Sequence, residues 1–513
     1  MKKYVHLSLV LILVLSMLAG CVGNDKPGGE TPQQPDGTTG IVEQPPKTLT
    51  MMIQSHASWP YNADWYVWDL IEEKVNIKLD VTTVVGGDYQ EKLNIVIASQ
   101  DLPNIIHIMG SPSEINKYGA DGALLDLLPH LGKMPNVKKY LEENNAKYLS
   151  YLSADGKLFA FPPGQGAGET NRRGWLYRKD IFEKHDLKIP ETSDDLYALM
   201  KQIKGLYPDS YPYTWRGGLS SQISMFVPLW GTGWKAYFDH DAGKFNYGPI
   251  EDEFKEMVEY INKAFNEDLL PPDILTLTTA QWQNLVSTDK VFITTDYLTR
   301  IDTLNSAVRE ENPDFTIAYM KPIAMGSKGE NKFTYSTIIS NALTISSTNK
   351  ELDATFRLFD FYLSDEGMEL LSWGEEGKTY NVVNGERKFI NSESIADIRN
   401  NFGLTTYGTN VNMDYNSHMS TFSPELFDAY EQGVKYDMRE DIEPAFTEEE
   451  YEEFVHLDEA LKKHKETAVA QFFIGSRSLD EWDQYVQETM NLGVERYLQL
   501  YDNAYQRTME MIK

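Results

Sequence analysis

Short apolar strands alternate with amphipathic helices near the start of this chain, between Leu49 and Ile108. The residue pattern predicts strands at 49–53, 77–81 and 102–108, and helices at 64–74 and 89–99. This alternation predicts a mostly parallel sheet with helices on both faces. In such a sheet, ligands bind beyond the carboxyl ends of the strands.

The length of the chain requires more than one hydrophobic core. Of its 513 residues, 466 follow residue 47 (513 − 47), which is too many for a single core. A capping box at Thr192 and Asp195 opens a second α/β region, with a helix at 254–265 and a strand at 291–294. We therefore expect two lobes.

The C-terminal third of the chain is predicted to be helical. A capping box at Thr447 begins one helix, and Ser478 with Glu481 forms another before the next helix. Aromatic residues then recur at helical spacing, which indicates packing against a lobe.

The first 21 residues are typical of a lipoprotein signal. Lys2 and Lys3 precede an apolar run, and small residues then lead to Cys21, the only cysteine. We predict that residues 1–20 are removed and that Cys21 is acylated. The alternative is an ordinary cleaved signal with an incidental cysteine.

Residues 21–47 are expected to form a disordered tether, because they are rich in Pro, Gly, Thr and Gln. The lobes would then stand at the extracellular face of the cell membrane, held by the lipid. Acylation of Cys21 would leave no thiol for disulfides, metal binding or catalysis.

The strong negative charge limits the partners of the chain. Its formal net charge is −30, and loss of Lys2 and Lys3 would make it −32 (−30 − 2). Such a surface repels nucleic acid and anionic lipid. An acidic cleft with few arginines would favour neutral or cationic ligands over uronates, although the sequence does not locate the charges.

The sequence lacks the common catalytic motifs. It has no His-Glu-x-x-His, no Gly-x-Ser-x-Gly and no P-loop. The glycines at 164, 166 and 168 suit a crossing between lobes better than phosphate binding. We predict no cofactor and no metal. Asp239 and Asp241 resemble part of a calcium loop but do not complete one.

Polar and aromatic residues at predicted strand ends, past the crossing and in one loop are the candidates for ligand binding. They are Trp59 and Asn62 after the first strand, Ser111 after the third, Arg172 and Trp175 past the crossing, Trp215 in a Tyr/Gly-rich loop, and Asp296 with Tyr297 at a later strand end. Each tryptophan could instead be core, Asp296 a helix cap, Arg172 hinge structure and Ser111 turn chemistry.

Four segments together resemble the extracellular solute-binding proteins of carbohydrate ABC transporters, and they occur in the same order as in maltose-type binding proteins. They read VFITTDY (291–297), FTIAYMKP (315–322), NKELDA (349–354) and YLSDEG (362–367). Further segments are similar to the large oligosaccharide-binding lipoproteins of Gram-positive bacteria. These read WLYRKD (175–180) with PET (190–192), WGEEGKTY (373–380), and WDQY (482–485) with AYQR (504–507).

The resemblance implies an α/β, two-lobed, periplasmic-binding-protein-like (Venus flytrap) fold with an extra helical C-terminal region. It implies lobe one at 48–160 plus 322–370 and lobe two at 161–321 plus 371–513. It also adds Trp373, as a sugar-stacking aromatic, and Glu375 to the candidate site. Alginate-type relatives carry a calcium loop where this chain has residues 204–210, with too few oxygen ligands to carry the metal over.

The predicted function is therefore a non-enzymatic, monomeric receptor that captures an oligosaccharide and delivers it to ABC permease subunits. Aromatic rings would cover the apolar face of a sugar, and polar side chains would pair with its hydroxyls. The alternatives are a peptide or amino-sugar receptor of the same fold, a surface polysaccharide-degrading enzyme, and a structural or adhesive lipoprotein.

Overall fold

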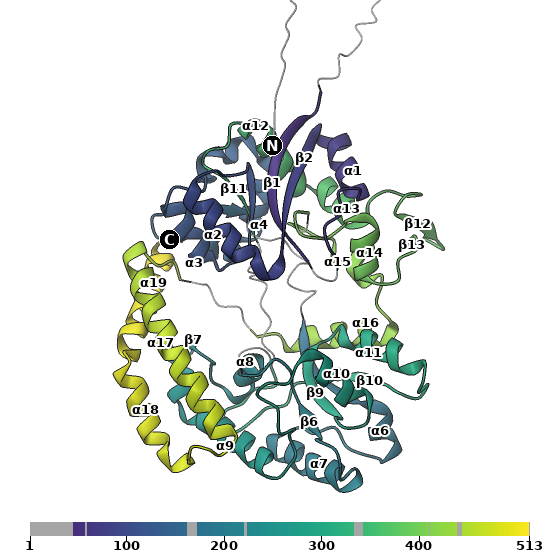
Figure 1. The fold of residues 1–513 in the computed structure, drawn as a ribbon, viewed down its shortest axis with the longest axis vertical. Helices are drawn as coiled ribbons and strands as arrows, with labels where there is room; N and C mark the ends of the chain where they lie inside the picture. Colours follow the sequence, from purple (N-terminus) through teal and green to yellow (C-terminus); the bar gives the residue numbers. More distant parts are fainter. Residues whose placement is uncertain are drawn as a thin grey trace, which may run out of the picture. The chain divides into compact units, whose positions relative to one another are not determined.

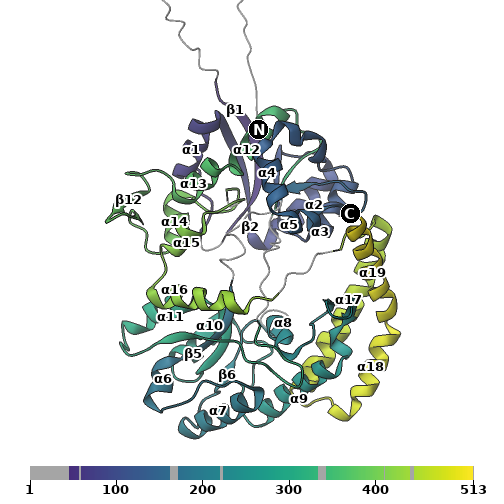
Figure 2. The same cartoon turned by 180° about the vertical axis from the view of Figure 1, so that it is seen from behind.

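Two larger sheets organise the part of the chain that the computed structural model describes (Figures 1 and 2). The described residues are 45–56, 59–161, 172–219, 223–332, 342–409, 411–438 and 444–511. The predicted signal, Cys21, most of the tether and the glycines at 164–168 lie outside them. Each sheet has its own hydrophobic core, which confirms the α/β, two-lobed prediction.

The sheet of lobe one has the strand order β2-β1-β3-β11-β4. Its strands are β1 (Lys47–Ser55), β2 (Ile77–Val85), β3 (Ile105–Ile108), β4 (Ala160–Phe161) and β11 (Ala342–Ile345). The first three are parallel, as predicted, whereas β11 runs antiparallel to β3 and β4. The sheet is therefore mixed, because β11 joins it from a distant part of the chain.

Helices cover the sheet of lobe one (Figure 1). Along the chain, α1 follows β1 and α2 follows β2. They are α1 (Tyr66–Val75), α2 (Tyr89–Ser99), α3 (Pro112–Ala120), α4 (Pro135–Glu143), α5 (Asn145–Tyr151), α12 (Leu352–Tyr362) and α13 (Asp365–Trp373). The helices expected at 64–74 and 89–99 are thus confirmed, since their apolar residues form the core beneath them.

Lobe one also includes a segment that the sequence assigned to lobe two. Leu371, Ile398, Leu404 and Val411 are buried in the core of lobe one, so the predicted boundary at residue 370 is wrong. The segment contains β12 (Tyr380–Val383), β13 (Glu386–Phe389), α14 (Ile395–Phe402) and α15 (Tyr415–Met419). The segment belongs to lobe one because its apolar residues pack in that core. No sequence motif indicates this packing.

The sheet of lobe two has the strand order β10-β5-β9-β6. Its strands are β5 (Arg173–Arg178), β6 (Tyr213–Thr214), β9 (Ile293–Tyr297) and β10 (Ile317–Met320). The strand β9 pairs antiparallel with β5 and parallel with β6. A separate antiparallel hairpin pairs β7 (Ala236–Asp239) with β8 (Lys244–Tyr247).

The helices of lobe two pack on both of its cores. They are α6 (Lys179–Lys184), α7 (Ser193–Leu206), α8 (Ile223–Phe226), α9 (Asp252–Asn266), α10 (Thr279–Ser287), α11 (Arg300–Arg309) and α16 (Pro424–Gly433). Thr192 and Asp195 form the predicted capping box of α7.

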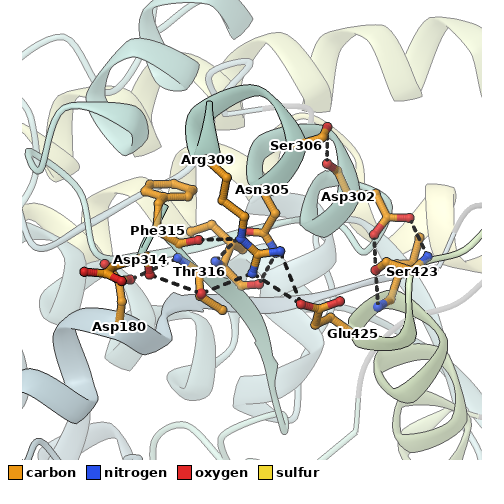
Figure 3. Close-up of polar contacts among 12 residues, drawn as sticks. Asp180, Asp302, Asn305, Ser306, Arg309, Asp314, Phe315, Thr316, Ser423 and Glu425 are labelled. Atoms are coloured by element: carbon orange, nitrogen blue, oxygen red, sulfur yellow. Dashed lines mark hydrogen bonds and ion pairs between the residues drawn. The ribbon is translucent and has the colours of Figure 1, made fainter. Parts of the chain in front are cut away.

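Side chains of α11 attach α16 and β10 to lobe two (Figure 3). Asp302 accepts hydrogen bonds from the backbone and hydroxyl of Ser423, the N-cap of α16. Arg309 pairs with Glu425 at 3.3 Å and donates to the carbonyl of Phe315 at 2.8 Å. The beginning of α16 is therefore fixed by polar contacts from a single helix.

The C-terminal region consists of α17 (Glu448–Phe473), α18 (Trp482–Asn491) and α19 (Val494–Met511), which run together in Figure 2. Thr447 forms the predicted capping box with Glu450. The box predicted at Ser478 is wrong, because that side chain instead caps a short 3-10 turn, Leu479–Glu481, through Asp480. None of the described helices is long and apolar enough to cross a membrane.

Candidate functional site

A stack of planar side chains lies just beyond the carboxyl end of β1. The rings of His56 and Trp59 are parallel, with centroids 3.5 Å apart, and the guanidinium of Arg399 lies over Trp59 at 4.3 Å. The ring of Tyr407 contacts His56 and the buried His107 of β3. We call His56, Trp59, Arg399 and Tyr407 the lobe-one cluster.

Helix α14 brings Arg399 to this cluster. The helix begins at a capping box made by Ser394 and Asp397, and it ends at Gly403, whose left-handed φ of +72° suits a residue without a Cβ. The indole of Trp65, which directly precedes α1, donates to the carbonyl of Asn400 at 2.9 Å. This contact ties the last turn of α14 to the loop that carries Trp59.

The loop after α14 has a strained backbone. Thr405 has a φ of +52°, which is unfavourable for a β-branched residue and tends to occur at functional sites. Its carbonyl accepts a hydrogen bond from Nε of Arg399 at 3.1 Å, so the strained residue helps to orient the guanidinium.

Several polar groups near the lobe-one cluster are buried without a hydrogen bond. Within the described residues, Nε1 of Trp59, Oγ1 of Thr405 and both ring nitrogens of His418 have no partner. Burial and the nearby Arg399 charge lower the pKa of His418 to about 3 and lower that of His56 to a smaller extent. Both imidazoles are thus neutral at pH 7. Because buried polar groups normally have partners, these atoms beside the stacked rings make this strand end a candidate ligand site.

The corresponding strand end in lobe two is held by charges. Asp296, at 0% exposure, accepts two hydrogen bonds from Arg216, at 2.5 and 2.9 Å. Arg300 lies 3.5 Å from the same carboxylate, and the backbone N–H of Tyr297 donates to it at 2.7 Å. The carboxylate is therefore fully engaged and orients the two arginines. We call Asp296, Arg216 and Arg300 the lobe-two network.

Tyr297 lies beside this network in contact with Arg173. The register of the sheet places the two residues opposite one another, and the Arg173 guanidinium lies 4.2 Å from the centre of the tyrosine ring. Arg173 also donates a hydrogen bond to the tyrosine hydroxyl. The pair presents a cation and an aromatic ring at the end of β9.

A pocket of about 840 Å³ brings together two other predicted residues, Arg172 and Trp373. Arg172 forms an ion pair with Asp437. Trp373 is 4% exposed, stacks on Phe389 and donates from Nε1 to Asp414 at 2.6 Å. The pocket is also lined by residues of α15, α16 and the β12–β13 hairpin.

Two of the predicted tryptophans lie in the core of lobe two. Trp175 and Trp215 are both 0% exposed, and Trp175 packs between Tyr213 and Phe226. Neither ring presents a face to a ligand in this structure. Trp175 lies in the inner strand β5 and Trp215 directly follows β6, and both are part of the core beneath the sheet.

Three other predicted residues make local contacts. Ser111 is the N-cap of α3, and Asn62 accepts a hydrogen bond from the backbone of Asp64 at 2.9 Å. Glu375 pairs with Lys378 at 2.6 Å and accepts a hydrogen bond from the Tyr66 hydroxyl. The alternative of turn chemistry thus accounts for Ser111.

Sequence reasoning missed His56, Arg399, Tyr407 and Arg216. His56 follows the predicted first strand and could have been found by the same rule as Trp59, whereas Arg216 follows β6, which was not predicted. No linear signal connects Arg399 or Tyr407 to a strand end, because the fold alone brings them there. The described residues contain no group of three or more His, Cys, Asp or Glu side chains able to hold a metal ion.

Comparison with known proteins agrees with this architecture. The family model described as bacterial extracellular solute-binding protein matches residues 56–369. The polygalacturonan/rhamnogalacturonan-binding protein YtcQ of Bacillus subtilis is 24% identical, with 99% of each chain covered. The fructooligosaccharide ABC transporter substrate-binding protein FusA of Streptococcus pneumoniae is 22% identical, with 98% of each covered.

The fold is also similar to solved structures. The alginate-binding protein AlgQ2, in its calcium-free crystal structure, superposes with a TM-score of 0.73 at 22% identity, over 90% of this chain and 98% of that one. The family match confirms the resemblance predicted from the sequence and the prediction of a binding protein rather than an enzyme. The chain is therefore a member of the bacterial extracellular solute-binding protein family.

Proposed function

We propose that this protein is a lipid-anchored receptor that captures an oligosaccharide at the strand ends of its two lobes and delivers it to an ABC permease. The observation that carries the proposal is the lobe-one cluster, where planar side chains stack beside buried polar groups without partners. Sugars need both kinds of surface, since aromatic groups cover their apolar faces and polar groups pair with their hydroxyls.

The relatives support the same class of ligand. YtcQ and FusA are named for binding polygalacturonan or rhamnogalacturonan and fructooligosaccharide, respectively. The ligands in these names differ in charge and in sugar, so the names favour an oligosaccharide but do not identify which one. Acylation of Cys21 and release of residues 1–20 would hold the receptor at the extracellular face of the membrane, where a permease could receive the ligand.

Ligand capture can be tested by a thermal-shift screen of the purified chain against plant, host and microbial oligosaccharides. A ligand at one hundred times its dissociation constant should add about 2.7 kcal/mol to the free energy of unfolding. A stabilising glycan that is recovered intact supports the receptor. Cleavage of that glycan, or no stabilisation by any oligosaccharide in the panel, would contradict it.

Replacement of Trp59 locates the site. With a glycan identified in the screen, Trp59→Ala should weaken binding by about 30-fold, equivalent to about 2 kcal/mol, as for a central aromatic contact. Isothermal titration calorimetry measures this change. Trp234→Ala is a matched control, because Trp234 is also partly buried and has a cation, Lys465, 4.3 Å from its ring. Equal effects of the two substitutions would refute a role of Trp59 in the ligand site.

A further inference from the structure

The ion pairs of the described residues leave two partly buried arginines without a carboxylate. Aspartate and glutamate outnumber lysine and arginine by 77 to 47. Accordingly, almost every described arginine pairs with an acidic side chain. Among the described residues, Arg173, Arg357 and Arg399 have no such pair.

These three arginines differ in their surroundings. Arg357 is exposed, so water solvates its charge, and Nε donates to the carbonyl of Val75 at 3.0 Å. Arg173 lies on the ring of Tyr297 at a strand end of lobe two. Arg399 lies on Trp59 at a strand end of lobe one. The two partly buried arginines without a carboxylate are therefore both at strand ends, where this fold class binds ligands.

The groups around Arg399 do not neutralise its charge. Its neighbours are the carbonyl of Thr405, the ring of Trp59, the hydroxyl-bearing Tyr407 and two histidines, His56 and His418. Burial lowers the pKa of Arg399 to about 10, so the guanidinium stays charged at pH 7. The lowered pKa values of the histidines keep them neutral. This strand end thus has a positive charge in a chain that is otherwise strongly negative.

We propose that the ligand is an acidic oligosaccharide and that Arg399 binds one of its carboxylates, with Arg173 as a second cationic contact. The inference rests on the proposed function. A guanidinium can bind a carboxylate with two parallel hydrogen bonds, and its Nε is already held by Thr405, which orients the rest of the group. An acidic cleft would favour a neutral or cationic ligand, whereas the positive charge of Arg399 at this strand end favours an acidic one.

The first test changes only the ligand. Binding of trigalacturonic acid to the purified full chain is compared with binding of its fully methyl-esterified form by isothermal titration calorimetry. We expect the acid to bind at least tenfold more tightly. Sialyllactose and lactose form a second pair, so that preference for the acid member of either pair identifies the source of the carboxylate as a uronate or a sialate.

The second test changes the protein. Arg399→Gln should abolish the preference for the acid over its ester, and Arg173→Gln should reduce it by a smaller factor. Arg357→Gln, which removes an arginine that also lacks an ion pair but is exposed, should leave the preference unchanged. A preference that persists in Arg399→Gln overturns the role of Arg399. Since the ligand pairs are measured on the unaltered chain, the proposal can be tested even if a variant does not fold.

The outcomes separate this inference from the proposed function. Binding without preference for the acidic member of either pair, or tighter binding of the neutral members, overturns the acidic ligand and leaves the oligosaccharide receptor in place. Absence of binding to every oligosaccharide overturns both.

Discussion

The strand ends of the two lobes both carry arginines, but the charges of these arginines are balanced differently. In lobe two, Asp296 neutralises Arg216 and Arg300 within the protein. In lobe one, Arg399 has no described carboxylate, and Trp59 and His418 have buried polar atoms without partners. A paired charge needs nothing further to be stable in the folded state, whereas unpaired buried groups cost free energy until a ligand satisfies them.

This difference suggests that the two strand ends have different roles, one in stability and one in ligand binding. The lobe-two network is a rigid support whose charges are already satisfied, so its substitution should affect stability. The lobe-one cluster lies beside the strained Thr405 and beside buried polar atoms without partners, which is typical of a binding surface. Its substitution should affect binding and pH dependence more than stability.

The largest effect is expected from Asp296→Asn. Loss of the carboxylate leaves two arginines, 13% and 21% exposed, without their counter-ion, and breaking such a buried pair costs about 3 kcal/mol or more. Denaturant unfolding measures the change. Asp353→Asn, which removes an exposed partner of Lys133, serves as the control and should leave stability unchanged. A small change in the free energy of unfolding on Asp296→Asn would contradict the structural role of the lobe-two network.

The next largest effect is a pH-dependent loss of stability caused by His418. Its pKa is about 3 in the folded protein, against an ordinary value of 6.5, so below pH 6.5 the unfolded chain binds a proton that the folded protein does not. Stability from this group is therefore present above pH 6.5 and is lost progressively as the pH falls toward 3. Between pH 7 and pH 5 the loss is about 2 kcal/mol.

The measurement compares the free energies of unfolding of the unaltered chain and of His418→Gln at pH 7 and pH 5. The variant should lose about 2 kcal/mol less over this interval, because the other titrating groups are common to both proteins. Parallel losses would mean that His418 is accessible to protons, and the lobe-one cluster would then be less buried than the structure shows.

The smallest effect is expected from Thr405→Gly. Glycine adopts the positive φ without strain, and relief of about 1 kcal/mol should offset the loss of the buried side chain. Thermal unfolding should therefore show little change or a slight stabilisation. Thr409→Gly is the control, since Thr409 is buried in the same loop without a positive φ and its hydroxyl is hydrogen-bonded. Equal destabilisation by both would show that residue 405 is not strained.

Local sequence signals predicted the first strands and helices of lobe one. The strands and helices between Leu49 and Ile108 form where the apolar periodicity placed them, because residues close in sequence determine which face of each element is apolar. Capping boxes at Thr192 and Thr447 begin helices as expected. The error at Ser478 shows the limit of this signal, since the same residue pattern also fits a single 3-10 turn.

The candidate site was predicted less completely. Trp59 and Tyr297 were found because they follow predicted strands, and both lie in clusters with a cation on the ring. Trp175 and Trp215 were selected for their places past the crossing and in a Tyr/Gly-rich loop, but they are core residues, since place along the chain does not distinguish a buried ring from an exposed one.

The sequence by itself determined the order of elements, the need for two cores and the excess of negative charge, because each depends on residue type and local periodicity. Only the tertiary structure decided where the charges meet. Arg399 reaches Trp59 across 340 residues of chain (399 − 59), and Arg216 reaches Asp296 through the register of one sheet. Contacts of this kind depend on how separate elements pack, and packing is a property of the whole core rather than of any one segment.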